Sequence, residues 1–101
     1  MKAILKAVGK PPEVIDIDND LKALQEAVDG YIEVLGVGDN VLMICDEEGK
    51  LKGKPYNFDL GHDIIVGDVL FVKSSGEDFT DLDDVSANVV LNFFSRTPYT
   101  T

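Results

Sequence analysis

Residues 31–45 read YIEVLGVGDNVLMIC, two short apolar runs with a glycine-rich polar stretch between them. Short runs rich in valine, isoleucine and leucine, bounded by Gly, Asp and Asn, predict β-strands. We therefore expect strands over residues 31–35 and 41–45, joined by a turn over residues 36–40. The second run is apolar on both faces, which predicts a strand in the interior of a sheet.

Two strands and a helix are predicted before this stretch. Residues 2–8 alternate in polarity, and residues 13–17 form a second run after the turn GKPP. The short connection between these two runs favours an antiparallel hairpin. A helix is expected over Asp20–Asp29, with Asp18 or Asn19 as its N-terminal cap.

The segment after residue 45 predicts turns, one clear strand and a second helix. A turn is expected over residues 46–49, a loop over residues 57–63, a strand over residues 69–72 and a surface loop over residues 74–78. The second helix is expected to begin near residues 81–83 and to end near Phe94. Its core-facing stripe is expected to consist of Val85, Val89 and Phe93, with Val90 and Phe94 beside it.

These elements follow one another in the order β-β-α-β-β-(β)-β-α. Short hairpins and segregated helices predict an α+β fold with a mainly antiparallel β-sheet and two helices. A chain of 101 residues has the length of one domain. We expect that single α+β domain to span residues 1–96, and residues 97–101 to form a frayed C-terminal tail.

The charge of the chain restricts its partners. It has 19 acidic and 9 basic residues, for a formal net charge of −10. Such a protein repels anionic membranes and nucleic acid backbones, so no membrane contact and no direct nucleic acid binding are expected. Basic proteins and metal cations remain as partners. No apolar run approaches the roughly 18 residues of a membrane span, and a single cysteine fits a cytoplasmic, reducing compartment.

The positive charge is concentrated between residues 50 and 57, in the sequence KLKGKPYN, named here the lysine strip. If it is extended, Lys50, Lys52 and Lys54 share one face. This pattern predicts a site for a small anionic ligand, in which the lysines meet phosphate or carboxylate, Tyr56 stacks and Asn57 hydrogen-bonds. The alternative is an exposed hairpin face whose lysines discourage edge-to-edge association.

Catalytic and metal chemistry has little support in the residues. The chain has one histidine, His62, and one cysteine, Cys45, whereas a structural zinc site needs four ligands. Cys45 lies in the most apolar run, which predicts a buried structural thiol. No catalytic residue, metal ligand or cofactor is therefore predicted, and we expect the chain not to be an enzyme. A homodimer stays open, because it would double these groups across an interface.

An ordered set of short segments resembles a known family. They are MKAIL at residues 1–5, PEV at 12–14, LQ at 24–25, GYIE at 30–33, ICDEEGK at 44–50, PYN at 55–57, IIVG at 64–67 and EDF at 77–79. Together they resemble domain-of-unknown-function family 3846, small uncharacterised domains of gut bacteria, phages and conjugative elements. The resemblance covers roughly residues 1–94. It implies a mobile-element setting, in which small accessory proteins often counter host defences.

Two functions follow as hypotheses. The first is a non-enzymatic accessory protein of a phage or other mobile element, whose acidic exterior meets a basic host protein. In its sharper form it is a counter-defence inhibitor that imitates the charge of DNA, with a nucleic-acid-binding protein as its target. The second is a small-molecule binding protein that sequesters a nucleotide or other anion on the lysine strip.

Overall fold

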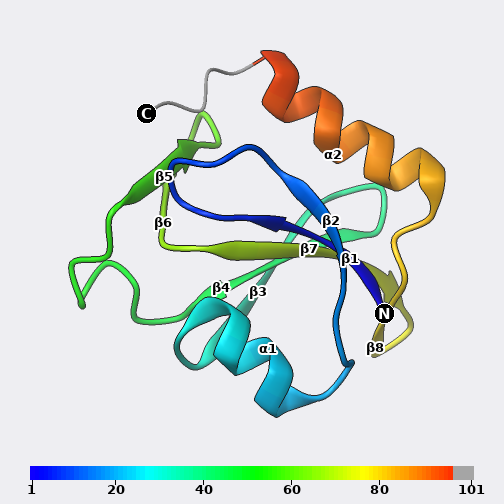
Figure 1. Ribbon diagram of the computed structural model, residues 1–101, viewed down its shortest axis with the longest axis horizontal. Coiled ribbons are helices and arrows are strands. Elements are labelled where there is room, and N and C mark those ends of the chain that lie inside the picture. Colours follow the sequence, from blue (N-terminus) through cyan, green and yellow to red (C-terminus); the bar gives the residue numbers. More distant parts are fainter. Residues whose placement is uncertain (97–101) are drawn as a thin grey trace.

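The computed structural model describes residues 1–96, and the tail predicted over residues 97–101 lies outside these described residues. The prediction of an α+β fold is confirmed, since strands in antiparallel pairs and two helices make up the described chain (Figure 1). Their bounds are β1 (Lys2–Lys6), β2 (Glu13–Asp16), α1 (Leu21–Val28), β3 (Ile32–Gly38), β4 (Val41–Asp46), β5 (Tyr56–Asp59), β6 (Ile64–Val66), β7 (Val69–Ser75), β8 (Asp78–Thr80) and α2 (Asp84–Arg96). Within residues 1–96 no helix is long and apolar enough to cross a membrane.

The main sheet has the strand order β2-β1-β7-β4-β3, and β8 extends it by pairing with β7. Every pairing in it is antiparallel. The predicted interior position of residues 41–45 is confirmed, because β4 lies between β7 and β3. Asp39 and Asn40 join β3 to β4 with positive φ angles of 52° and 62°. That conformation is the one a two-residue hairpin turn requires, and Asp and Asn tolerate it.

Two strands occupy segments that were predicted as loops. Tyr56–Asp59 pairs with Ile64–Val66 as a separate two-stranded sheet, so the loop predicted over residues 57–63 is wrong in its first half. The cause is burial, because Phe58 and Ile65 enter the core and their backbones pair as they do so. The surface loop predicted over residues 74–78 is also wrong, since β7 continues to Ser75 and turns into β8.

The N-terminal cap of α1 is one residue later than predicted. Asp20, not Asp18 or Asn19, accepts a hydrogen bond from the amide nitrogen of Ala23 at 2.8 Å. The Asn19 side chain instead donates to the carbonyl oxygen of Phe79 at 3.0 Å. Asp18, Asn19 and Asp20 are all residue types that can cap a helix. The contact of Asn19 with the distant Phe79 therefore determines which of them does so.

The two helices cover opposite faces of the main sheet, as Figure 1 shows with α2 above the strands and α1 below them. On the α1 face, Leu24 and Val28 pack with Ile44 and Leu70. On the α2 face, the core is aromatic. Phe94 of α2 meets Phe58 of β5 edge to face, with 4.8 Å between ring centroids, and meets Phe71 of β7 at 5.8 Å.

The stripe of α2 that enters the core is not the predicted one. Val90 and Phe94 are buried, whereas Val85, Val89 and Phe93 are 75%, 51% and 37% exposed. Both stripes are apolar and lie next to each other on the helix. The helix is rotated so that Phe94 reaches Phe58 and Phe71, which leaves the predicted stripe at the surface.

Candidate functional site

The lysine strip is not extended. Residues 49–53 form successive turns, in which the amides of Lys52 and Gly53 donate to the carbonyl oxygens of Glu48 and Lys50. The expectation that alternate lysines share one face is therefore wrong. Lys50 pairs with Asp63, with 2.6 Å between Nζ and Oδ1, whereas the other two lysines pair with Asp46.

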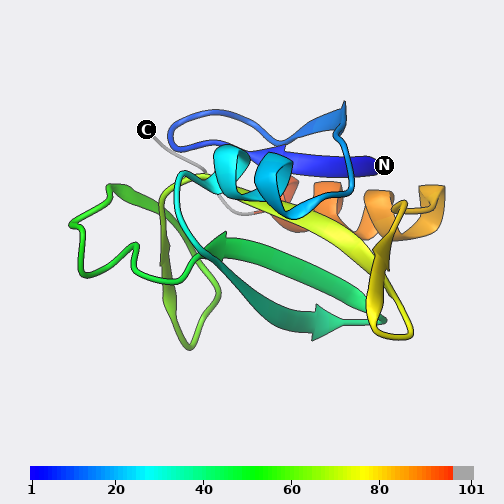
Figure 2. The ribbon, with the colours of Figure 1, turned by 90° about the horizontal axis from the view of Figure 1, so that it is seen from below.

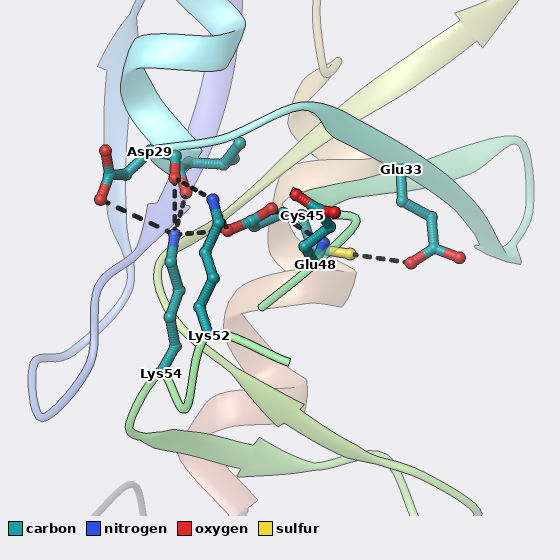
Figure 3. A network of polar contacts seen from close by, with 8 residues as sticks. Asp29, Glu33, Cys45, Glu48, Lys52 and Lys54 are labelled. Atoms are coloured by element: carbon teal, nitrogen blue, oxygen red, sulfur yellow. Dashed lines mark hydrogen bonds and ion pairs between the residues drawn. The ribbon is translucent and has the colours of Figure 1, made fainter. Parts of the chain in front are cut away.

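Lys52 and Lys54 converge on the carboxylate of Asp46, at the end of β4 (Figure 3). Their Nζ atoms lie 2.9 Å and 2.8 Å from Oδ2, and the Glu48 amide donates to Oδ1 at 2.9 Å. The Asp46 side chain is only 1% exposed. Burial alone would raise its pKa, but the hydrogen bonds from Lys52, Lys54 and the Glu48 amide outweigh burial and hold the pKa well below its ordinary value.

The same lysines also complete the C-terminal end of α1. Lys54 Nζ donates to the carbonyl oxygens of Val28 and Asp29 at 2.7 Å and 2.8 Å, and Lys52 Nζ donates to Asp29 at 3.3 Å. The last carbonyl groups of a helix lack partners within it and carry partial negative charge, so an ammonium group stabilises them. Gly30 is needed at this junction, because a Cβ there would overlap the Asp46 carboxylate.

Tyr56 and Asn57 lie in different environments. Tyr56 is exposed, whereas Asn57 is buried against Lys6 of β1. The Asn57 amide donates to the carbonyl oxygens of Lys6 and Gly67, and its Oδ1 accepts from Lys6 Nζ at 2.8 Å. Burial lowers the pKa of Lys6, and its ammonium lies 5.7 Å from the Phe94 ring centroid. Of the predicted anion site, the structure therefore leaves Lys50 and Tyr56 at the surface and engages Lys52, Lys54 and Asn57 in internal contacts.

Cys45 of β4 is buried, as predicted. Its Sγ lies 3.9 Å from Oε1 of Glu33 on the neighbouring strand. Burial, together with the negative charge of Glu33, raises the pKa of the thiol to about 11. The reactive thiolate is therefore scarce at neutral pH.

We expect Cys45 not to react with a disulfide reagent such as dithionitrobenzoate in the native protein at pH 8. In denaturant, one thiol per chain should react at the rate of a free cysteine, because unfolding exposes the sulfur and removes Glu33 from its side. The release of thionitrobenzoate, followed by absorbance, measures both. Rapid reaction of the native protein would contradict the assignment of a buried thiol.

A groove on the α2 face of the sheet was not predicted from the sequence. It has a volume of about 610 Å³ and is named here the α2 groove. Leu35 of β3, Val41 of β4 and Phe71 of β7 lie along it, and Val89 and Phe93 of α2 form one wall. Asp39 at the β3–β4 turn and His62 and Asp63 after β5 supply polar groups. One feature of the sequence does indicate the groove. Helix α2 has two adjacent apolar stripes, and the sheet can bury only one of them.

Metal ligands are not grouped in the part of the chain that the structure describes, where no three His, Cys, Asp or Glu side chains could hold one ion. A protein-family model described as a domain of unknown function (DUF3846) matches residues 1–95. No curated protein and no solved structure matches the chain.

Proposed function

Since the chain belongs to the DUF3846 family, which is described by sequence and not by activity, we propose from its own structure that it is a non-enzymatic binding protein whose acidic surface takes a basic partner protein. The observation that carries this proposal is where the charges lie. Of the 19 acidic residues, all but Asp46, Asp63 and Asp68 are exposed.

The lysines neutralise only part of this surface, because acidic residues outnumber basic residues by 19 to 9. Carboxylates of the chain itself pair with Lys2, Lys50, Lys52, Lys54 and Lys73. Lys6 is fully buried. The surface is therefore strongly anionic, and such a surface speeds the encounter with a cationic partner and repels anionic ones.

The more specific form of the proposal concerns the partner and the setting. The partner is a nucleic-acid-handling host protein, and the chain is an inhibitor encoded by a phage or other mobile element that occupies the partner's DNA-binding surface. The support is the charge, which has the sign of a nucleic acid backbone, and the setting implied by the family resemblance. A reducing cytoplasm suits the single thiol of Cys45.

Binding to the partner should weaken steeply with salt. A partner protein is first captured on the immobilised chain at low salt and then purified. We expect it to bind about tenfold or more weakly at 0.5 M than at 0.05 M salt, because salt screens the attraction between surface charges. Duplex DNA should compete for the same partner. Biolayer interferometry at both salt concentrations measures the affinities, and equal affinities would exclude an electrostatic interface.

The second hypothesis has less structural support than the first. It places a site for a nucleotide or other small anion on Lys50, Lys52, Lys54, Tyr56 and Asn57. An anion would have to compete with Asp46 for Lys52 and Lys54, and both lysines also hold the end of α1. Asn57 would have to leave the core to reach it. At Lys50 an anion would have to compete with Asp63, so Tyr56 is the member that it could meet without a rearrangement.

A further inference from the structure

Helix α2 is narrower than the sheet face on which it lies. At about 4.8 Å between strands, five strands place the outer two about 19 Å apart, whereas a helix with its side chains is about 10 Å across. α2 packs on β1, and its Phe94 packs on Phe71 of β7. Figure 2 shows the consequence, with α2 behind the β1–β7 side and the β3–β4 hairpin extending beyond it. The α2 groove lies beside the helix on this face, and Leu60, His62 and Asp63, which follow β5, line it as well.

The side of α2 that borders this groove is apolar. Val85, Val89 and Phe93 follow one another at a spacing of four residues and are exposed, and the last two line the α2 groove. Rows of side chains four residues apart form the ridges that pack between helices. An exposed apolar row beside an apolar floor marks an interaction surface, because single soluble domains rarely expose such contiguous patches without a partner.

The edge of the main sheet formed by β3 is poorly suited to the addition of a strand. The register between β3 and β4 shifts between Gly36 and Gly38, next to the groove. A bulge of this kind bends an edge strand and disrupts the regular ladder that an added strand would need. The ridge on α2 and the irregular edge of β3 therefore favour a helix over an extended segment as occupant.

The charge around the α2 groove selects the kind of helix. The described residues that line it include Asp39 and Asp63, but no lysine or arginine. Asp63 is paired with Lys50, whereas Asp39 is exposed at the turn. A second copy of this chain would bring another formal net charge of −10, and like charges oppose that association. A cationic occupant meets complementary charge instead.

We infer that the α2 groove binds an amphipathic α-helix of a partner protein, with apolar residues toward Val89 and Phe93 and with lysine or arginine beside them. The inference rests on the proposed function and adds its binding site and the form of the partner. The charged exterior then governs how fast the partner arrives, and the apolar groove governs how long it stays.

The test uses a labelled peptide of about 18 residues, or five helical turns, with leucine on one face and lysine on the other. A second peptide has the same composition in scrambled order, so that it keeps the charge without the apolar face. Fluorescence anisotropy measures binding to the wild-type chain, to Val89→Gln and to Val14→Gln. Val14 lies on β2, outside the groove, and is 47% exposed against 51% for Val89, so the two substitutions are matched.

We expect the amphipathic peptide to bind more tightly than the scrambled one. Val89→Gln should weaken its binding about tenfold, because an apolar contact is lost, and Val14→Gln should leave it unchanged. Circular dichroism of both variants checks that they fold alike.

Equal binding of the two peptides, with no effect of Val89→Gln, would overturn the groove proposal and leave the proposed acidic binding surface standing. Failure of both cationic peptides to bind at low salt would count against both proposals. A dimer in sedimentation equilibrium that Val89→Gln dissociates would overturn the inference by making a second copy the occupant.

Discussion

Replacing Phe94 with alanine is expected to lower the free energy of unfolding by about 3–5 kcal/mol. Phe94 is 1% exposed, and its ring contacts rings from both sheets, Phe58 of β5 and Phe71 of β7. The substitution removes a large buried side chain at the place where α2, β5 and β7 meet, and none of these elements can move in without losing its own contacts. Urea unfolding followed by circular dichroism measures the change, since the chain has no tryptophan.

The neighbouring residue supplies a matched control. Phe93 is 37% exposed and also touches the rings of Phe58 and Phe94. Phe93→Ala should cost about 1 kcal/mol, because much of its surface is already in water. Equal losses for the two variants would mean that the rotation of α2 on the sheet has been assigned wrongly.

Asp46→Asn is expected to lower the free energy of unfolding by about 2–3 kcal/mol at neutral pH. The substitution removes the charge that Lys52 and Lys54 share, and it places an amide NH₂ among groups that already donate. The loss stays below that of a fully buried pair because Lys52 is partly exposed and can turn to water. Asp29→Asn is the control, since Asp29 is almost fully exposed and 3.9 Å from Lys54, and it should leave stability unchanged.

The pH dependence of the free energy of unfolding shows whether Asp46 stabilises the fold through its charge or through its shape. Its pKa is lower in the folded protein than in the unfolded chain. The stabilisation is therefore complete above the unfolded pKa of about 4 and is lost as the pH falls toward the folded value. The difference in stability between wild type and Asp46→Asn should be constant near neutral pH and should shrink below about pH 4. A difference that does not change with acid would assign the effect to shape.

Local signals predicted the β3–β4 hairpin, but the predicted turn over residues 36–40 is too long, because β3 continues to Gly38. Its turn contains Asp39 and Asn40, residue types that adopt positive φ, and its second run is apolar on both faces as an interior strand requires. The stripe of α2 could not be chosen in the same way. Val89 and Val90 are both apolar and adjacent, and only the positions of Phe58 and Phe71 decide which one is buried.

The candidate site was harder to predict because its contacts join distant segments. Alternation in the lysine strip fits an extended strand, but Gly49 and Gly53 allow turns, and the turns direct Lys52 and Lys54 to Asp46. Asparagine is a residue type typical of surface turns, so Asn57 was expected at the surface. Its partner Lys6 is fifty-one residues away, and no local pattern indicates that pairing.

The place of β7 in the sheet bears on the order of events during folding. β1 with β2, and β3 with β4, are pairs of strands that are close in the chain and can form early and separately. β7 comes later in the chain and lies between β1 and β4, so that Ile4 pairs with Phe71 across most of the sequence. Closing so long a loop is slow compared with forming a hairpin. We therefore expect the arrival of β7 to limit the folding rate, and the sheet to stay open on the ribosome until residue 75 has emerged.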